Sequence, residues 1–266
     1  MNLYEQIVIY VLTGVLGICV GSFLNVVIYR VPNGMSLAFP ASHCPACNYA
    51  LKWYDNIPVL SYIILGGKCR SCKARISPRY AAVELANMLL WLLAVLVFWE
   101  RSPVLAVIAA LASSLMICVF FIDLEHKLVF DRFVIMIGIL GIVSCFFDPA
   151  YGWLSHLIGG AVGFISFFGI AWAFEKLRGI EGLGGGDIKL TAVCGLLLGW
   201  QRLLLSVLAA SVSASVVLLI LSRIKNDPEN GESAEYPFAP FLTFGFALAM
   251  FFGEAIIEWY LTAIGV

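Results

Sequence analysis

Four cysteines with regular spacing form the clearest potential metal site in the sequence. They occur as two pairs, Cys44-Pro-Ala-Cys47 and Cys69-Arg-Ser-Cys72, with 21 residues between the pairs. Each CxxC turn presents two thiolates about one tetrahedral edge apart, so two turns supply the four sulfur ligands of a closed zinc site. Such a site leaves no coordination position open, and we therefore expect structural zinc. An iron–sulfur centre and redox-active thiol pairs remain alternatives.

Two aspartates form a second potential site, suited to acid–base chemistry. Asp123 ends an apolar run, and Asp187 follows three glycines, residues 184–186. Two carboxyl groups held close together share one proton and titrate as a unit. The ionised member takes a proton from water while the protonated member donates to a carbonyl, which hydrolyses a peptide without a covalent intermediate. The glycines would allow an extended peptide backbone to approach closely.

The helix macrodipole predicts different roles for the two carboxyl groups. Asp187 is expected at a helix N-terminus, where an anion is favoured, and Asp123 at a helix C-terminus, where it is not. This effect makes Asp187 the expected base and Asp123 the expected acid. In the plainer interpretation, both aspartates are ordinary interface residues that cap helices and face water.

These residues belong to a chain that is too apolar to be a soluble domain. Of its 266 residues, 62% are hydrophobic and 12% are charged, whereas soluble domains have about 45–50% and about 25%. The formal net charge of −1 argues against nucleic-acid binding. We predict an all-α polytopic membrane protein of about eight transmembrane helices with a small zinc-bound cytosolic loop domain. The expected helices are 7–29, 80–99, 103–122, 133–147, 153–174, 188–200, 203–221 and 239–264.

The distribution of basic residues orients these helices. Of the 16 lysine and arginine residues, all but Arg101 and Arg202 fall in alternate loops, namely 30–79, 123–132, 175–189 and 223–238. The positive-inside rule places these loops in the cytosol and both termini outside. Asp123 and Asp187 are then expected to meet at cytosolic helix ends. The expected domains are a first helix (1–29), the zinc loop (30–79) and a membrane domain of seven helices (80–266).

Two other functions would also place carboxylates in a helical bundle. A proton- or metal-coupled transporter is one, although transporters bind near the bilayer midplane on broken helices. A catalytically inactive assembly protein with a zinc loop is the other. Replacing each aspartate by asparagine would separate both alternatives from a peptidase.

A wider set of motifs resembles one known family. The matching residues are Gly21-Ser22-Phe23-Leu24-Asn25 with Arg30 and Pro32, the four cysteines, Gly67-Lys68-Cys69-Arg70, the Asp123 motif, Gly184-x-Gly186-Asp187 with Lys189, and Pro237-Phe238-x-Pro240-Phe241. Together they resemble the type IV prepilin leader peptidases, bifunctional enzymes of type IV pilus and type II secretion systems. The GxGD element alone is less specific, because presenilin-like and signal-peptide peptidases also contain it.

The resemblance implies an activity, a cosubstrate and a location. It implies cleavage of prepilins or pseudopilins at the cytosolic face of the bacterial inner membrane, with Asp123 and Asp187 as the catalytic residues. It also implies N-methylation of the new N-terminal residue by S-adenosylmethionine, associated with the loop domain 30–79. Gly67 and Lys68 match the cofactor-binding positions. A prepilin, with its basic leader and apolar helix, would lie in the lipid bilayer with its cleavage point at the inner interface.

The sequence departs from the family pattern at one turn. The family usually has Leu-Pro-Asp at the end of the first aspartate motif, and this chain has Val129-Phe130-Asp131. The missing proline is expected to loosen the turn. The two carboxylate positions are unaffected.

Overall fold

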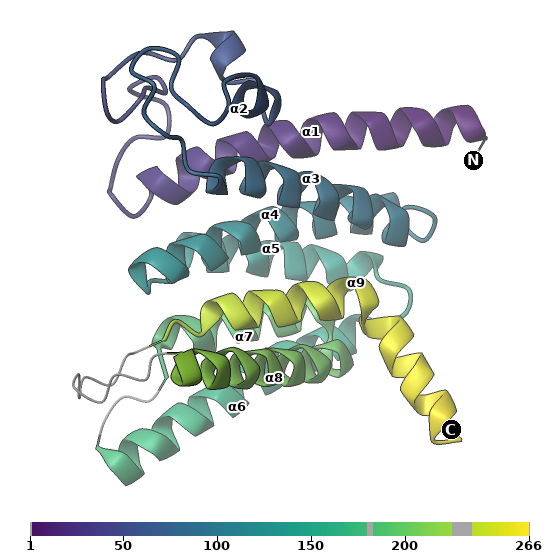
Figure 1. Cartoon of the computed structure of the whole chain (residues 1–266). Coiled ribbons are helices and arrows are strands. Elements are labelled where there is room, and N and C mark those ends of the chain that lie inside the picture. The colour runs from purple at the N-terminus through teal and green to yellow at the C-terminus, as the bar shows by residue number, and fades with distance from the viewer. Residues whose placement is uncertain (1, 180–182, 225–235, 266) are drawn as a thin grey trace. The chain divides into compact units, whose positions relative to one another are not determined.

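The protein is helical throughout the part of the chain that the structure describes. The computed structural model describes residues 2–179, 183–224 and 236–265, and these residues form helices and two isolated β-bridges but no strand (Figure 1). The elements are α1 (Leu3–Arg30), the 3-10 helix η1 (Trp53–Asp55), α2 (Leu60–Ile64), α3 (Arg79–Phe98), α4 (Pro103–His126), α5 (Asp131–Phe147), α6 (Trp153–Arg178), α7 (Gly185–Leu198), α8 (Trp200–Ile224) and α9 (Ala239–Ala263).

Six of these helices are long and apolar enough to cross a membrane: α1, α3, α4, α6, α8 and α9. All eight expected segments are helical, so the prediction of an all-α protein with several candidate spans is confirmed. The other two, α5 and α7, have 17 and 14 residues. At about 1.5 Å per residue they measure about 25 Å and about 21 Å, against about 30 Å of hydrocarbon.

The chain forms two compact units, residues 1–118 and 119–266, and the helix α4 begins in the first and ends in the second. Each unit has its own packing.

In the first unit, α1 and α3 run side by side (Figure 1). A chain of buried polar groups ties them together and extends to α4. Asn87 donates from its side-chain nitrogen to the Gly17 carbonyl at 2.7 Å and accepts from the Ser114 hydroxyl at 2.7 Å. The Trp91 indole nitrogen donates to the same hydroxyl at 2.9 Å. Side-chain hydrogen bonds of this kind stabilise helix pairs where no water is available.

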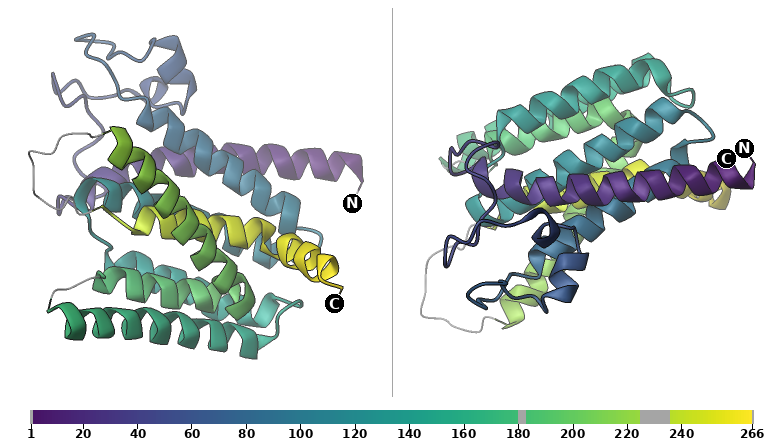
Figure 2. Two further views of the ribbon diagram at one scale, coloured as in Figure 1. Left: turned by 60° about the horizontal axis from the view of Figure 1, so that its bottom comes forward. Right: turned by 90° about the horizontal axis from the view of Figure 1, so that it is seen from above.

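In the second unit, α7 packs against α5 and α6, while α8 packs against α9 (Figure 2). Small residues allow the close contact between α6 and α7. Gly159 lies against the backbone of Gly195, and Gly163 lies against the backbone of Thr191, with no room for a Cβ at either glycine. These glycines are therefore packing contacts between the two helices.

The expected break between α7 and α8 is also present. Gly199 ends α7 with φ of 80°, and α8 begins at Trp200. Just beyond the break, Arg202 forms a buried ion pair with Asp148 at 2.6 Å, and it also donates to the Leu198 carbonyl at 2.6 Å. Arg202 is only 4% exposed. This pair joins the end of α5 to the start of α8.

Candidate functional site

Asp123 lies in the last turn of α4 and is almost fully buried. Asp123 is 5% exposed, and its Oδ2 accepts a hydrogen bond from the Ala239 N–H at 3.2 Å. Ala239 is the first residue of α9, so the carboxyl group faces the positive end of that helix. The helix that favours an anion at Asp123 is therefore a different helix from the one that carries it.

Asp187 lies in the first turn of α7 and is half-buried. Its backbone N–H donates to the Gly184 carbonyl at 3.0 Å, and its carbonyl accepts from the Thr191 hydroxyl at 2.8 Å. Asp187 lies outside the six candidate spans, one residue before the apolar segment that begins at Ile188. Burial, and then the negative charge of Asp123, raise the pKa of Asp187 to about 7.

The segment between α4 and α5 brings the two aspartates together. Val129 in this segment lies so close to Gly186 that a Cβ there would stand 2.8 Å from the Val129 Cβ. Near the same turn, the Lys189 ammonium group contacts the Asp131 carboxylate at 2.8 Å. This ion pair is exposed and adds little to stability, but it joins the first turns of α5 and α7. The helix ends that carry Asp123 and Asp187 are thus neighbours.

This arrangement is chemically suited to activating water. One carboxyl group is buried against a helix N-terminus, and its neighbour has a pKa near neutrality. At a pH between the two pKa values the pair holds one proton, because a second negative charge nearby is disfavoured. One ionised and one protonated carboxyl group are the requirements for general base and general acid catalysis.

The four loop cysteines form a second cluster, in the first unit. Their sulfur atoms all lie within 4.8 Å of one another. The Cys44 and Cys72 sulfurs are 3.9 Å apart, and the Cys47 and Cys69 sulfurs are 4.0 Å apart. A tetrahedron of sulfurs around zinc, with bonds of about 2.3 Å, has edges of about 3.8 Å. The spacing therefore fits one tetrahedral ion and is too long for a disulfide.

Each CxxC pair sits on a turn with the same backbone pattern. The Cys44 N–H donates to the Tyr49 carbonyl at 2.9 Å, and the Cys69 N–H donates to the Ala74 carbonyl at 2.8 Å. Backbone N–H groups of Cys72 and then Ser71 lower the pKa of the Cys69 thiol to about 7. At Cys72 the Ala74 N–H lowers the pKa, but the neighbouring thiols and burial outweigh it and raise the pKa to about 11. Cys69 is therefore the thiol of this turn that most readily becomes the thiolate that binds a metal.

A buried carboxylate joins the two cysteine turns. Asp55, 8% exposed, binds Arg70 of the second turn at 2.6 Å through Oδ1 and accepts from the Tyr49 hydroxyl at 3.2 Å through Oδ2. Burial acts to raise the pKa of Asp55, but hydrogen bonds from Arg70, from the Lys52 N–H and from Tyr49 outweigh it and lower the pKa. The sequence analysis missed this contact, because Asp55 belongs to no recognisable motif.

Gly67 and Lys68 lie directly before Cys69 on the second cysteine turn. Gly67 has φ of 66°, and its carbonyl accepts from the Ile76 N–H at 2.8 Å. Lys68 is exposed and forms the isolated bridge with Arg75. Neither residue lines the cavity that lies between this loop and α1.

Comparison with known families covers both units. A family model described as the bacterial peptidase A24 N-terminal domain matches residues 15–98. A second, described as the type IV leader peptidase family, matches residues 110–219. No solved structure matches the chain.

Curated relatives match over most of their length. A prepilin leader peptidase/N-methyltransferase of Pseudomonas aeruginosa is 35% identical, over 95% of this chain and 93% of its own. Proteins of the same name from Pseudomonas putida and Myxococcus xanthus are 33% and 39% identical. The match to the Pseudomonas putida protein covers 92% of this chain and 91% of that protein. The match to the Myxococcus xanthus protein covers 84% of this chain and 67% of that protein.

Proposed function

The chain belongs to the type IV leader peptidase family, and from this premise we propose that it removes the leader from prepilins or pseudopilins and N-methylates the residue exposed by the cut. The observation that carries the peptidase proposal is the juxtaposition of Asp123 and Asp187 at the ends of α4 and α7.

Asp123 is the proposed base and Asp187 the proposed acid. The Ala239 N–H and the positive end of α9 stabilise an ionised Asp123, whereas burial and the Asp123 charge keep Asp187 protonated up to a pH of about 7. This assignment reverses the one expected from each aspartate's own helix. The reason is that the Asp123 charge lies beside Asp187 and that α9 supplies a second helix terminus to Asp123.

The proposed reaction uses only water and these two groups. Ionised Asp123 takes a proton from water as the water oxygen attacks the scissile carbonyl, whose oxygen receives the Asp187 proton. When the carbon–nitrogen bond breaks, the amine leaves with a proton from Asp123, and the carbonyl oxygen returns its proton to Asp187. The products are a carboxylic acid and an amine, and both aspartates regain their starting protonation states.

The positions of the aspartates favour this reaction over transport. Asp123 is followed by only three residues of α4, and Asp187 is the third residue of α7. A coupled transporter would carry its charged residues near the bilayer midplane. Carboxyl groups at helix ends meet a substrate that lies at the interface.

Methylation is proposed for the first unit. S-adenosylmethionine would supply the methyl group, which a neutral amine accepts while the carbon–sulfur bond breaks and a proton is released. The four cysteines would hold structural zinc, since thiolates at these separations suit a tetrahedral ion and leave no open position. Gly67 and Lys68 remain proposed contacts of the methyl donor.

The proposed setting is the bacterial inner membrane. The six candidate spans, completed by the shorter α5 and α7, would give eight crossings with both termini outside. The cysteine loop and both aspartates would then face the cytosol, where the basic leader of a prepilin remains.

Mass spectrometry of a prepilin incubated with the full-length protein and S-adenosylmethionine tests both activities. The expected product has lost its leader and gained one methyl group. Asp123→Asn and Asp187→Asn should each abolish cleavage, by about a thousandfold or more. Asp131→Asn is the matched control, because Asp131 is exposed and its one ion pair within the described part of the chain is with Lys189. Cleavage at the wild-type rate by both Asn variants would contradict the proposal.

A further inference from the structure

The short helix α2 of the cysteine loop exposes an apolar face. Leu60, Ile63 and Ile64 are spaced i, i+3 and i+4, so they share one side of the helix, and they are 56%, 66% and 76% exposed. Ser61 is buried, and its hydroxyl donates to the Ile57 carbonyl at 2.8 Å. The helix is thus fixed through its polar side, while three large aliphatic side chains face outward. A contiguous apolar group of this kind marks an interaction surface.

An exposed tryptophan lies next to α2. Trp53 begins η1 and is 80% exposed. The Ser61 hydroxyl also donates to the carbonyl of Tyr54, the neighbour of Trp53, at 3.0 Å, which ties η1 to α2. Tryptophan is enriched at membrane–water interfaces, because its ring is apolar and its N–H is polar. The apolar patch of the loop is defined here by four side chains: Trp53, Leu60, Ile63 and Ile64.

The position of α2 along the membrane helices indicates what covers the apolar patch. The Val59 N–H, directly before α2, donates to the Glu84 carboxylate of α3 at 2.7 Å. With 20 residues, α3 measures about 30 Å, which matches the hydrocarbon layer. Glu84 is the sixth residue of α3, so it lies only about 7.5 Å from the helix start. The contact therefore holds the start of α2 near the level at which the apolar layer begins.

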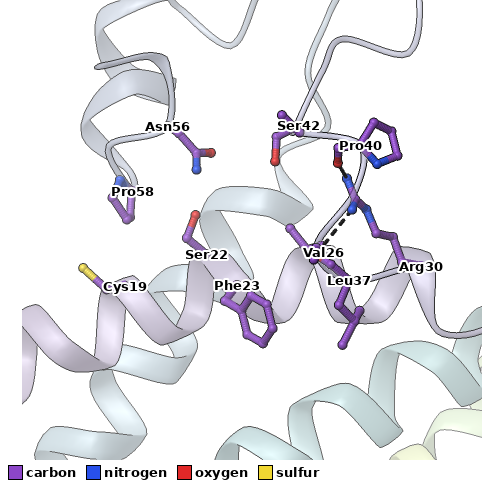
Figure 3. A pocket seen from close by; sticks show the side chains of 12 residues that line it. Cys19, Ser22, Phe23, Val26, Arg30, Leu37, Pro40, Ser42, Asn56 and Pro58 are labelled. Atoms are coloured by element: carbon purple, nitrogen blue, oxygen red, sulfur yellow. Dashed lines mark hydrogen bonds between the residues drawn. The ribbon is translucent and has the colours of Figure 1, made fainter. Parts of the chain in front are cut away.

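The residues before α2 hold the loop against α1 in the same way. Asn56 and Pro58 line a cavity of about 420 Å³ together with Cys19 and Ser22 of α1, and Figure 3 shows these side chains around one space. Cys19 and Ser22 lie eleven and eight residues before the end of α1 at Arg30, or about 17 Å and about 12 Å along the helix. The loop thus folds back alongside the first candidate span and does not extend straight into water.

The loop also carries an excess of positive charge. Its one acidic residue within 31–78 is Asp55, which is buried against Arg70. The same range contains five basic residues, all exposed: Lys52, Lys68, Arg70, Lys73 and Arg75. A zinc ion held by four thiolates would add two negative charges, which still leaves the loop positive. An anionic lipid surface attracts such a segment by about fivefold in binding per basic residue, whereas a basic prepilin leader would be repelled.

We propose that the cysteine loop docks on the adjoining lipid leaflet, with the apolar patch inserted among the lipids and the basic residues on anionic headgroups. Buried apolar area and attraction to anionic lipid are the two contributions that bind an interfacial segment, and the loop supplies both. The loop is then a membrane-bound element and not a freely solvated domain. This inference goes beyond both proposed activities and depends on neither.

Photo-crosslinking in lipid nanodiscs tests whether the apolar patch contacts lipid. The full-length protein would carry the photoreactive residue benzoylphenylalanine in place of Ile64, in nanodiscs of phosphatidylglycerol. Ala46 is the matched control position, because it is exposed on the same loop and its cysteine turn, residues 44–47, carries no basic residue. After irradiation, mass spectrometry should find phospholipid attached at position 64 at least about fivefold more often than at position 46.

Two results of the crosslinking experiment would overturn the proposal. The first is equal lipid attachment at the two positions. The second is a covalent dimer of the chain, formed through position 64 in place of a lipid adduct, because it would show that a second copy covers the apolar patch.

Hydrogen exchange tests the contribution of charge. In the wild-type protein, residues 57–65 should exchange at least about fivefold more slowly in nanodiscs of phosphatidylglycerol than in nanodiscs of zwitterionic phosphatidylcholine. Lys73→Gln combined with Arg75→Gln should remove most of this difference. Lys176→Gln combined with Arg178→Gln is the matched control, because it makes the same change in charge at exposed residues of the second unit.

The wild-type comparison needs no variant, so a poorly folded variant does not affect it. Equal exchange of residues 57–65 in the two lipids would overturn the headgroup contact. Equal effects of the two double variants would overturn its assignment to the loop. Unchanged exchange of residues 42–50 would show that the first cysteine turn remains folded in each variant. Since neither readout involves a cleaved or methylated product, failure of this proposal leaves the proposed function intact.

Discussion

Asp123 Oδ2 accepts a hydrogen bond from the N–H of Ala239, which is 3.2 Å away in space and 116 residues later in the chain. This contact gives a physical reason for the Pro237-Phe238-x-Pro240 motif. Pro240 is the second residue of α9, a position that tolerates proline and starts the helix sharply. The helix therefore begins where its first N–H can reach the carboxyl group.

The pH dependence of cleavage should reveal which aspartate is the acid. Burial and the Asp123 charge raise the pKa of Asp187 to about 7, so Asp187 loses its proton as the pH rises through that value. If it is the acid, the cleavage rate falls by about tenfold per pH unit above about pH 7. Rates measured from about pH 5 to about pH 9 test this. A rate that instead rises through neutrality would assign Asp187 as the base.

Replacing Gly186 by alanine should impair cleavage strongly. The added Cβ would lie 2.8 Å from the Val129 Cβ, so Asp187 must move relative to Asp123. We expect a loss of about tenfold to a hundredfold in kcat with little change in KM. Gly185→Ala is the matched control, because a Cβ at Gly185 meets nothing within 4 Å. Adding Val129→Ala to the Gly186→Ala variant should restore part of the activity, and no restoration would refute steric conflict as the cause.

Removal of zinc should loosen the loop and leave the aspartate pair in place. The purified protein is expected to contain one zinc per chain, and chelation or Cys44→Ser should increase hydrogen exchange of residues 44–72. Cys118→Ser is the control, since Cys118 is buried alone in α4 and belongs to no cysteine cluster of the described residues. Iron in place of zinc, measured by elemental analysis, would support the iron–sulfur alternative.

Asp55→Asn should destabilise the cysteine loop, because it removes the ion pair with Arg70. The loss should be only about 1 kcal/mol, because the Arg70 side chain is 43% exposed and water partly screens the pair. The pKa of Asp55 is lower in the folded protein than in the unfolded chain, where it is about 3.9. The stabilisation that the ionised Asp55 gives to the loop is therefore fully present above about pH 3.9. It is lost as the pH falls through the lower folded pKa. Hydrogen exchange should therefore show a difference between wild type and variant at neutral pH that shrinks in acid. A constant difference would contradict the ionic role.

Phe130→Pro should be tolerated, although a missing proline was expected to loosen this turn. Phe130 already has φ of −77°, within the range of proline, and its N–H donates to no backbone carbonyl of the described residues. We expect unchanged cleavage and a gain of about 0.4–1 kcal/mol in stability. Ile137→Pro, inside α5, should cost about 3 kcal/mol or more. Thermal unfolding of the two variants would measure both effects.

The helices were predictable because hydropathy and length are local properties of the sequence. The apolar segments and a break close to Gly199 follow from composition and length alone. The clustering of the cysteines follows from the spacing within each CxxC pair. Even so, α8 begins at Trp200 and is longer than expected, because Arg202 is buried in an ion pair and does not end a helix.

The contacts that tune the site were not predictable, because each joins segments with no shared local pattern. The Ala239 N–H reaches Asp123 from another helix, and Asp55 reaches Arg70 across the cysteine loop. The dipole of the helix that carries each aspartate is not enough to assign the two roles, because α9 supplies a second helix terminus to Asp123 and the Asp123 charge lies beside Asp187.

The shortness of α5 and α7 has a consequence for the surrounding lipid. In the proposed arrangement of eight crossings, their lengths of about 25 Å and about 21 Å are less than the usual hydrocarbon thickness, so the bilayer would thin near the ends of these helices. Headgroups and their hydration would then follow the helix ends inward. A protease that consumes water at every turnover would obtain it through this local depression of the membrane surface, without an aqueous channel through its core.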